Sequence, residues 1–249
     1  RGAAIYNRGY LTLNNVFIRG NRSDREGGGI YNQGSTTSID TATLIIHNSA
    51  FYFNWSATRG GAIYNAGEAR IHDRTVFEHN RAQNGGAIFN HVTRSGANQT
   101  GPIADLRALL EITAGVEFSY NRAVSVRESS NHLSGGHGGA IYNATFASAD
   151  ITGAFLNDNV ALHGGAIFTA GYLTLTAGSI QDNQAQGKGG AIYVSRCDVR
   201  LKQGNFVLGN TAPALGNGIA YATRASLLIS DGNLILDTVD EDADWVPAN

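Results

Sequence analysis

A motif of the form Gly-Gly-Ala-Ile-aromatic recurs in eight copies, with small variations, along this chain of 249 residues. The isoleucines of the motif are Ile5, Ile30, Ile63, Ile88, Ile141, Ile167, Ile192 and Ile219. The intervals between them are 25 to 27 residues, except for two expanded intervals of 33 and 53. Recurrence at a fixed period of about 20 to 50 residues is typical of solenoids and propellers, so the period limits the fold more than any other feature.

A second motif, apolar-x-x-Asn-x-small, occurs in the same phase in seven copies. Its asparagines are Asn21, Asn54, Asn80, Asn121, Asn159, Asn183 and Asn210. Between the two motifs lies a short segment of alternating apolar and polar residues, for example around Leu173 and Leu175. Alternation with period two is typical of a strand with one buried face, so each repeat is predicted to contain short strands joined by turns.

Like residues at like positions favour a solenoid over an antiparallel meander, because each residue of a solenoid stacks on its equivalent about 4.8 Å away in the next coil. The sequence therefore predicts an all-β, right-handed parallel β-helix of about eight coils with three loop insertions. The asparagines of the second motif are expected to point inward, close a turn and stack as a ladder. The 32 glycines, and three prolines outside the predicted strands, agree with this fold.

The pairing of Gly-Gly-Ala-Ile with Phe-x-x-Asn resembles the repeat of the polymorphic outer membrane protein family, named for chlamydial surface autotransporters. The resemblance covers residues 1 to about 223. It implies a bacterial, exported β-helical passenger or stalk, secreted or held at the cell surface in association with the outer membrane. A filament subunit that stacks end to end is a further alternative, because the open ends of a solenoid are exposed β-edges. Such modules are often adhesins, and the family has no shared catalytic residues to carry over.

The composition changes near the C-terminus. Residues 225–249 contain six acidic and no basic side chains, so we expect a β-helix domain at 1–224 and an acidic cap, or the start of a neighbouring region, at 225–249. The net charge of −2 gives no general attraction to nucleic acid. No apolar stretch approaches the roughly 18 residues of a transmembrane helix.

The three insertions mark places where the chain departs from winding, and insertions of solenoids map to surface loops. They comprise about 8 extra residues near Gln33 to Thr41, about 16 near His91 to Leu106, and about 11 between Val124 and His137. All three belong to repeats two and four, so they are expected to project from one stretch of the rod.

The same stretch has unusual residues around the asparagine of the second motif. The candidate binding residues are Tyr52, Phe53, Trp55, His79, Arg81, Tyr120 and Arg122. A column of Phe53, His79 and Tyr120 flanked by arginines could stack on sugar rings or hold a protein partner. In the alternative that we favour, the insertion at 124–137 folds down and buries the column, because large exposed apolar patches are uncommon.

The aromatic residues of the first motif form a longer row on the outward face. The row consists of Tyr6, Tyr31, Tyr64, Phe89, Tyr142, Phe168 and Tyr193. We favour a ladder of stacked rings that fixes the register between coils, with a protein or glycan contact strip as the alternative.

Groups that could support catalysis or bind metal are few. Asp158 and Asp182 occupy equivalent places in neighbouring coils and could act as paired carboxylates in glycoside hydrolysis, but solvated turn residues are the simpler interpretation. The histidines that could converge near the insertions are His91, His132, His137 and His163, and their spacing supports no metal site. Cys197 is interpreted as a small buried residue rather than a nucleophile.

We therefore expect a non-enzymatic structural or adhesive module without a cofactor or metal. The alternative is a polysaccharide-active β-helix enzyme, a hydrolase or lyase, or a glycan-binding module. The expected partners are a further copy of the chain, in an end-to-end or lateral homo-oligomer or fibre, or a host or environmental glycan or surface protein. Neither nucleic acid nor a transmembrane segment is expected.

Overall fold

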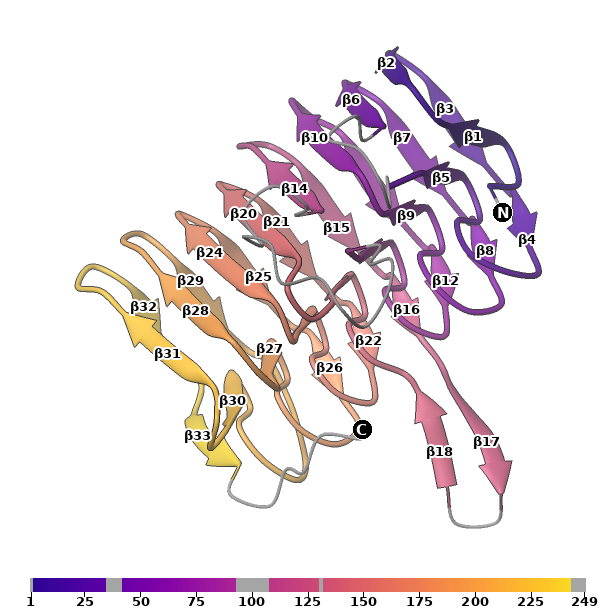
Figure 1. Ribbon diagram of the computed structural model, residues 1–249. Helices are drawn as coiled ribbons and strands as arrows, with labels where there is room; N and C mark the ends of the chain where they lie inside the picture. Colours follow the sequence, from indigo (N-terminus) through magenta and orange to yellow (C-terminus); the bar gives the residue numbers. More distant parts are fainter. Residues whose placement is uncertain (1, 35–41, 93–107, 130–131, 243–249) are drawn as a thin grey trace, which may run out of the picture.

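The computed structural model of the chain describes residues 2–34, 42–92, 108–129 and 132–242. The regular structure of these residues consists of strands, wound into a right-handed parallel β-helix (Figure 1), which confirms the predicted fold class. We number the coils 1 to 8 by the isoleucines of the first motif, from Ile5 in coil 1 to Ile219 in coil 8. In the described part of the chain, no helix has the length and hydropathy needed to cross a membrane.

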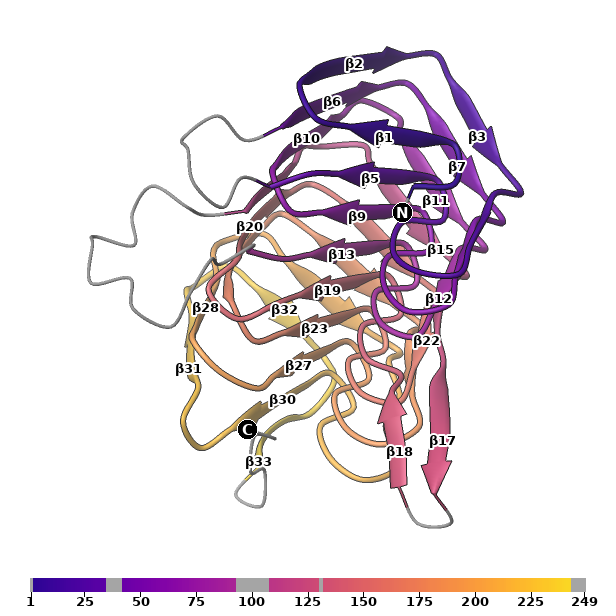
Figure 2. The same ribbon diagram turned by 45° about the vertical axis from the view of Figure 1, so that its right-hand side comes forward.

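The first sheet contains nine parallel strands (Figure 2). They are, in spatial order, β1 (Ile5–Asn7), β5 (Ile30–Asn32), β9 (Ile63–Asn65), β13 (Ile88–Asn90), β19 (Ile141–Asn143), β23 (Ile167–Thr169), β27 (Ile192–Val194), β30 (Ile219–Ala222) and β33 (Val239–Asp242). Each isoleucine of the first motif pairs with its equivalent in the next coil, from Ile5 with Ile30 through to Ile192 with Ile219. The isoleucines point inward, and alternation turns outward the residue that follows each of them, which is aromatic in coils 1 to 7.

The second and third sheets have eight parallel strands each. The second sheet consists of β2 (Tyr10–Asn14), β6 (Thr43–His47), β10 (Glu68–His72), β14 (Leu109–Ile112), β20 (Ser148–Thr152), β24 (Tyr172–Thr176), β28 (Asp198–Leu201) and β31 (Ser226–Ile229). The third sheet consists of β3 (Phe17–Arg19), β7 (Ala50–Tyr52), β11 (Val76–Glu78), β15 (Glu117–Ser119), β21 (Phe155–Asn157), β25 (Ser179–Gln181), β29 (Phe206–Leu208) and β32 (Leu234–Ile235).

A fourth sheet of two-residue strands follows the third and was not predicted. It consists of β4 (Arg22–Ser23), β8 (Trp55–Ser56), β12 (Arg81–Ala82), β16 (Arg122–Ala123), β22 (Val160–Ala161) and β26 (Gln184–Ala185). A strand of two residues is too short to show alternation, so the sequence pattern could not reveal it.

The interior of the rod is a continuous apolar core of isoleucine, leucine, valine, alanine and phenylalanine side chains. The rings of Phe51, Phe77 and Phe118 stack inside it, with centroids 4.7 and 4.8 Å apart. All three rings are fully buried, because the parallel register places each of them directly beneath its equivalent in the next coil.

The predicted asparagine ladder is present along the corner between the third and fourth sheets. Each side-chain amide of the series Asn21, Asn54, Asn80, Asn121, Asn159, Asn183 and Asn210 donates to the oxygen of the next, at 2.9 to 3.1 Å. The ladder ends on the carboxylate of Asp237, 2.7 Å from Asn210 Nδ2. The rungs also donate to backbone carbonyls, so they satisfy buried polar groups at a place where the chain turns.

A second asparagine ladder, which was not predicted, follows the first sheet. Its rungs are Asn7, Asn32, Asn65, Asn90 and Asn143, and Thr169 accepts from the last of them. The signal was in the sequence, since each of these asparagines directly follows the isoleucine and aromatic residue of the first motif.

The two glycines of the first motif are each required for a different structural reason. Gly60 has a φ of 64°, in the left-handed region that glycine enters without steric cost. Its neighbour Gly61 lies against the next coil, where a Cβ would come within 2.1 Å of the Gly86 carbonyl oxygen. Any side chain at Gly61 would therefore push two coils apart.

Two of the three predicted insertions, near Gln33 to Thr41 and near His91 to Leu106, lie for the most part outside the described residues. The third forms an antiparallel hairpin of β17 (Ser125–Ser129) and β18 (His132–Gly135), which extends away from the rod (Figures 1 and 2). The hairpin leaves the rod after β16 of the fourth sheet, whereas the other two insertions follow β5 and β13 of the first sheet. All three belong to coils 2 and 4, but they start from two different corners.

The acidic C-terminal segment continues the winding as far as it is described. Strands β31, β32 and β33 pair in parallel with β28, β29 and β30. The boundary at residue 224 stays a prediction, and no break in the sheets accompanies it.

Candidate functional site

The candidate site is the outer surface of the corner between the third and fourth sheets, which we call the corner surface. It contains three columns of residues that run along the rod. The first column lies at the end of the third sheet and contains Arg19, Tyr52, Glu78 and Ser119. The middle column contains Gly20, Phe53, His79, Tyr120, Asp158, Asp182 and Gly209. The last column is the fourth sheet, with Arg22, Trp55, Arg81, Arg122, Val160 and Gln184.

The turn that precedes the inward asparagine creates the middle column. The residue just before the asparagine has a left-handed backbone, with φ of 54° at Phe53, 54° at His79 and 55° at Tyr120. Glycine occupies the same position in coils 1 and 7, as Gly20 and Gly209. A left-handed conformation costs a residue with a Cβ about 1–2 kcal/mol, so three consecutive coils place a large ring where glycine would be free of strain.

These three rings form the stacked column that the sequence predicts. The centroids of Phe53 and His79 are 4.9 Å apart, and those of His79 and Tyr120 are 5.2 Å apart, with interplanar angles of 11° and 16°. Phe53 is 54% exposed and Tyr120 51% exposed. The favoured alternative, burial beneath the insertion at 124–137, is therefore wrong, because that insertion pairs with itself as a hairpin.

The stacking limits how the column can contact a ligand. The rings face one another along the rod and present their edges to solvent, since neighbouring planes are nearly parallel. A sugar ring cannot enter between them, so the predicted stacking of sugars along the column is wrong for its interior. Stacking remains available on the end face of the column that is formed by Phe53.

The flanking columns add cations and two further aromatic residues. The guanidinium of Arg22 lies over the ring of Trp55, 4.2 Å from its centroid. Arg81 and Arg122 are exposed and pair in register beneath Trp55. Tyr52 pairs with Arg19 on one side and Glu78 on the other. The structure thus brings all seven predicted binding residues onto one surface, in coils 2 to 4.

The C-terminal half of the middle column is acidic. Asp158 follows Tyr120 and accepts a hydrogen bond from its hydroxyl, and the Asp158 charge raises the pKa of Tyr120. Asp182 comes next, with a φ of 54° like the rings. The predicted neighbouring carboxylates are therefore adjacent, on a convex corner, and Asp158 has Tyr120 as a partner.

The aromatic row of the first sheet is a stacked ladder, as predicted. Its rings lie 4.6 to 5.6 Å apart from Tyr6 to Tyr193. The alternative of an exposed contact strip is wrong, since five of the seven rings are buried. Arg59 lies over Phe89 and donates to Tyr64, and small residues such as Ala66 pack on the ladder too.

Of the four predicted histidines, the structure brings His137 and His163 together. Their rings stack 5.3 Å apart, and burial lowers the pKa of His137 to about 3 and that of His163 to about 4. His91 packs instead against Tyr64 and Phe89, where burial lowers its pKa. His132 lies in the hairpin. Among the residues that the structure describes, no three potential metal ligands gather.

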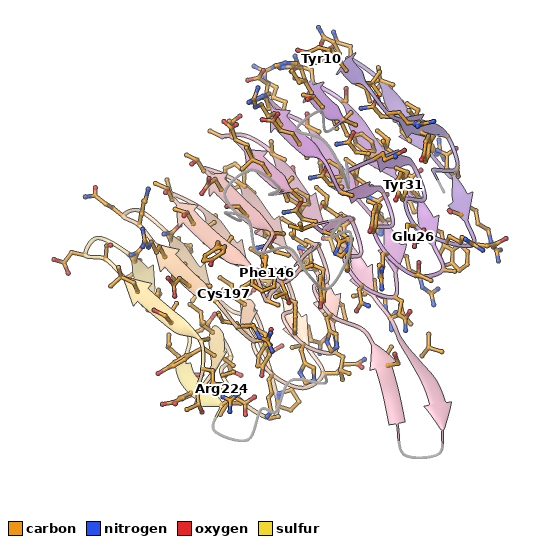
Figure 3. All side chains as sticks on the ribbon, in the orientation of Figure 1. Tyr10, Glu26, Tyr31, Phe146, Cys197 and Arg224 are labelled. Atoms are coloured by element: carbon orange, nitrogen blue, oxygen red, sulfur yellow. The ribbon has the colours of Figure 1, made fainter. Side chains whose placement is uncertain are left out.

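Cys197 lies next to Phe146 in the turn before β28 (Figure 3). It is half-buried, whereas a small buried residue was predicted, because it occupies a left-handed turn position, with a φ of 61°, and not the strand itself. Burial raises the pKa of its thiol, which makes it a weak nucleophile at neutral pH.

A buried ion pair at the C-terminal end was not predicted. Lys188 Nζ lies 2.7 Å from Asp242 Oδ1, and the hydroxyl of Tyr193 donates to Asp242 Oδ2 at 2.7 Å. Burial, followed by this hydrogen bond, raises the pKa of Tyr193. The cluster attaches β33 to the first sheet, so it is interpreted as structural.

Stacked coils, two asparagine ladders and an aromatic ladder define the chain as a solenoid repeat protein of the parallel β-helix class. More specifically, the chain carries the Chlamydia polymorphic membrane protein repeat, whose family model matches residues 15–33, 74–91, 115–144 and 178–195. Each match runs from the third strand of a coil, through the corner surface, to the first-sheet strand of the next coil. At a coarse level, this family indicates a surface-exposed outer membrane protein. Curated proteins and solved structures gave no match.

Proposed function

We propose that the chain is a non-enzymatic module of the cell surface that holds a glycan or a surface protein through its corner surface. The observation that carries the proposal is the column of Phe53, His79 and Tyr120, which is exposed although each ring occupies a strained backbone position. Strain of this kind concentrates at functional sites, because folding alone gives no reason to keep it.

The chemistry of the surface supports a binding role. Tyrosine, tryptophan and arginine are the residues that most often dominate the energy of interfaces, and all three occur side by side in coils 1 to 4. Later coils have no aromatic residue at the same places, where residues such as Asn157, Asp158 and Gln181 stand instead, so the aromatic part is confined to one stretch of the rod.

The proposal is tested with a variant in which Phe53→Gly, His79→Gly and Tyr120→Gly are combined. Glycine already fills this position at Gly20 and Gly209, so the variant keeps the turn. The purified variant should lose its binding to cultured animal cells and to glycan arrays, because it lacks the rings. Binding is measured by flow cytometry and array fluorescence.

The matched control is Asp182→Gly, which makes the same kind of change two coils beyond the rings. It should bind as the wild-type chain does. Retained binding by the triple variant, or equal loss by the control, would contradict a role of the corner surface.

The alternative of a polysaccharide-active enzyme depends on Asp158 and Asp182. Asp158 accepts the Tyr120 hydroxyl, and both carboxylates lie on an outward corner, which favours the binding role. Loss of polysaccharide turnover on replacing either aspartate by asparagine would establish the enzyme instead.

A further inference from the structure

The N-terminal end of the corner surface contains three aromatic side chains in one coil. Coil 2 presents Tyr52, Phe53 and Trp55 at successive outward positions. In coil 1 the residues at the same positions are Arg19, Gly20 and Arg22. Two of the three rings therefore have an arginine above them, and the middle ring has a glycine.

The glycine leaves one ring face open. Apart from its chain neighbours, no described residue lies within 4 Å of a Cβ built on Gly20, so no other described coil covers this position over Phe53. The opposite face of Phe53 is covered by His79, with centroids 4.9 Å apart. In the next column the equivalent space above Trp55 is filled by the guanidinium of Arg22, 4.2 Å from the ring centroid. We call this position over Phe53 the slot, and a flat ring bound there would continue the stack by one layer.

The charges around the slot are positive. Arg19 and Arg22 lie on either side of Gly20 in coil 1 and are both exposed. The nearest acid recorded for them is Asp24, whose carboxylate is 3.9 Å from Arg22 Nε, with side chains 73% and 90% exposed. An ion pair that open is weak and can exchange for another anion.

A flat ligand with an anionic group meets both requirements. The C–H face of a pyranose packs on an aromatic face, while its hydroxyls stay in water at the open side of the slot. A carboxylate on the ring can take two parallel hydrogen bonds from a guanidinium. We propose that the slot over Phe53, between Arg19 and Arg22, binds an acidic sugar, a pyranose ring that carries a carboxylate. This rests on the proposed binding role of the corner surface and names one ligand class for its end.

The direct test fills the slot from within. In Gly20→Tyr the new ring takes the place of the sugar, and the left-handed backbone is tolerated at the cost that Phe53, His79 and Tyr120 already bear in the next three coils. Gly209→Tyr is the control, because it adds the same ring at the same turn in coil 7, far from Phe53. Its Cβ would come within 2.4 Å of Asp182 Oδ1, so the Asp182 side chain has to turn aside to admit the ring.

The probe is trigalacturonate, and its neutral methyl ester serves as the reference ligand. Binding is measured by saturation-transfer NMR and titration at low salt. Wild-type chain and Gly209→Tyr should bind the acid, Gly20→Tyr should weaken binding by about tenfold or more, and the ester should bind about tenfold more weakly than the acid. In the double variant Arg19→Gln and Arg22→Gln, the acid and the ester should become equal.

Two results would overturn the slot. One is unchanged binding of trigalacturonate by Gly20→Tyr, and the other is equal binding of acid and ester by the wild-type chain. Both leave the proposed function standing if the triple glycine variant of the column still loses cell binding, since the partner would then contact the ring edges. If both Gly20→Tyr and the triple glycine variant still bound cells as the wild-type chain does, both proposals would be wrong.

Discussion

At the residue scale, the same turn serves two purposes in neighbouring positions. The inward asparagine closes the turn and satisfies buried backbone groups, while the residue before it faces solvent in a left-handed conformation. Asn80 is fully buried and the adjacent His79 has a side chain that is 42% exposed. The fold therefore depends on the asparagine column. The outer column is free to vary, and it contains rings, aspartates and glycines in different coils.

Replacing one asparagine rung should be costly. Asn80 Nδ2 donates to the Phe51 carbonyl and to Asn121 Oδ1, and its Oδ1 accepts from the backbone and side chain of Asn54. Asn80→Ala leaves several of these buried groups without a partner, at about 1–3 kcal/mol each, so we expect a loss of about 3–5 kcal/mol in the free energy of unfolding. Urea titration measures it.

The matched control for this change is His79→Gly, one residue away on the outer face. It should change the free energy of unfolding by no more than about 1 kcal/mol, since it removes strain as well as stacking. A small effect of Asn80→Ala, or an equal effect of the two variants, would contradict the separation of roles.

The residue-scale features were predictable where side chains recur in phase. The first asparagine ladder and the stacking of Phe53, His79 and Tyr120 follow from the period alone. Exposure was not predictable for the two aromatic columns. Tyr64 is buried in a cluster with Tyr31, Phe89 and small residues that lie outside the motif. Tyr120 is exposed because the hairpin folds away.

At the element scale, parallel register makes like side chains neighbours in every column. This is favourable for rings and amides, and it brings the imidazoles of His137 and His163 face to face. The sequence predicted three sheets correctly and missed the fourth, whose strands of two residues lack any period. The stacking of the two imidazoles in one column was not predicted either. It follows from the backbone, because the N–H of Gly138, directly after His137, donates to the carbonyl of His163.

The histidine column should make stability depend on pH. Folding holds the pKa of His137 at about 3 and of His163 at about 4, below the ordinary value of about 6.5. Between pH 6.5 and 4 the unfolded chain therefore binds more protons, and stability falls as the pH falls, by up to about 1.4 kcal/mol per pH unit for each histidine. Thermal midpoints measured from pH 7 to 4 give the slope.

The control variant combines His137→Asn with His163→Asn. Asparagine occurs in the same column as Asn84, so the change fits the backbone there. The slope between pH 6.5 and 4.5 should become shallower in this variant. A slope equal to that of the wild-type chain would show that the two histidines do not titrate on unfolding.

At the scale of the whole molecule, the chain is a rod in which one stretch presents exposed aromatic residues. Its apolar core runs through the coils, its ladders and glycine pairs recur in most of them, and the exposed aromatic residues of the corner surface gather in coils 2 to 4. The overall winding was predictable because eight copies of one pattern can stack in one way. The binding partner could not be predicted, because the fold does not constrain the side chains of the corner surface.

The central claim is that the chain keeps Phe53, His79 and Tyr120 for binding and not for folding, and the thermal midpoint of the triple glycine variant tests it most directly. Relief of left-handed strain at three positions offsets the loss of two ring contacts worth about 0.5–1.5 kcal/mol each. The account predicts a midpoint within about 4 °C of the wild-type value, or above it. A midpoint lower by about 10 °C or more would show that the column stabilises the rod, and would contradict the claim.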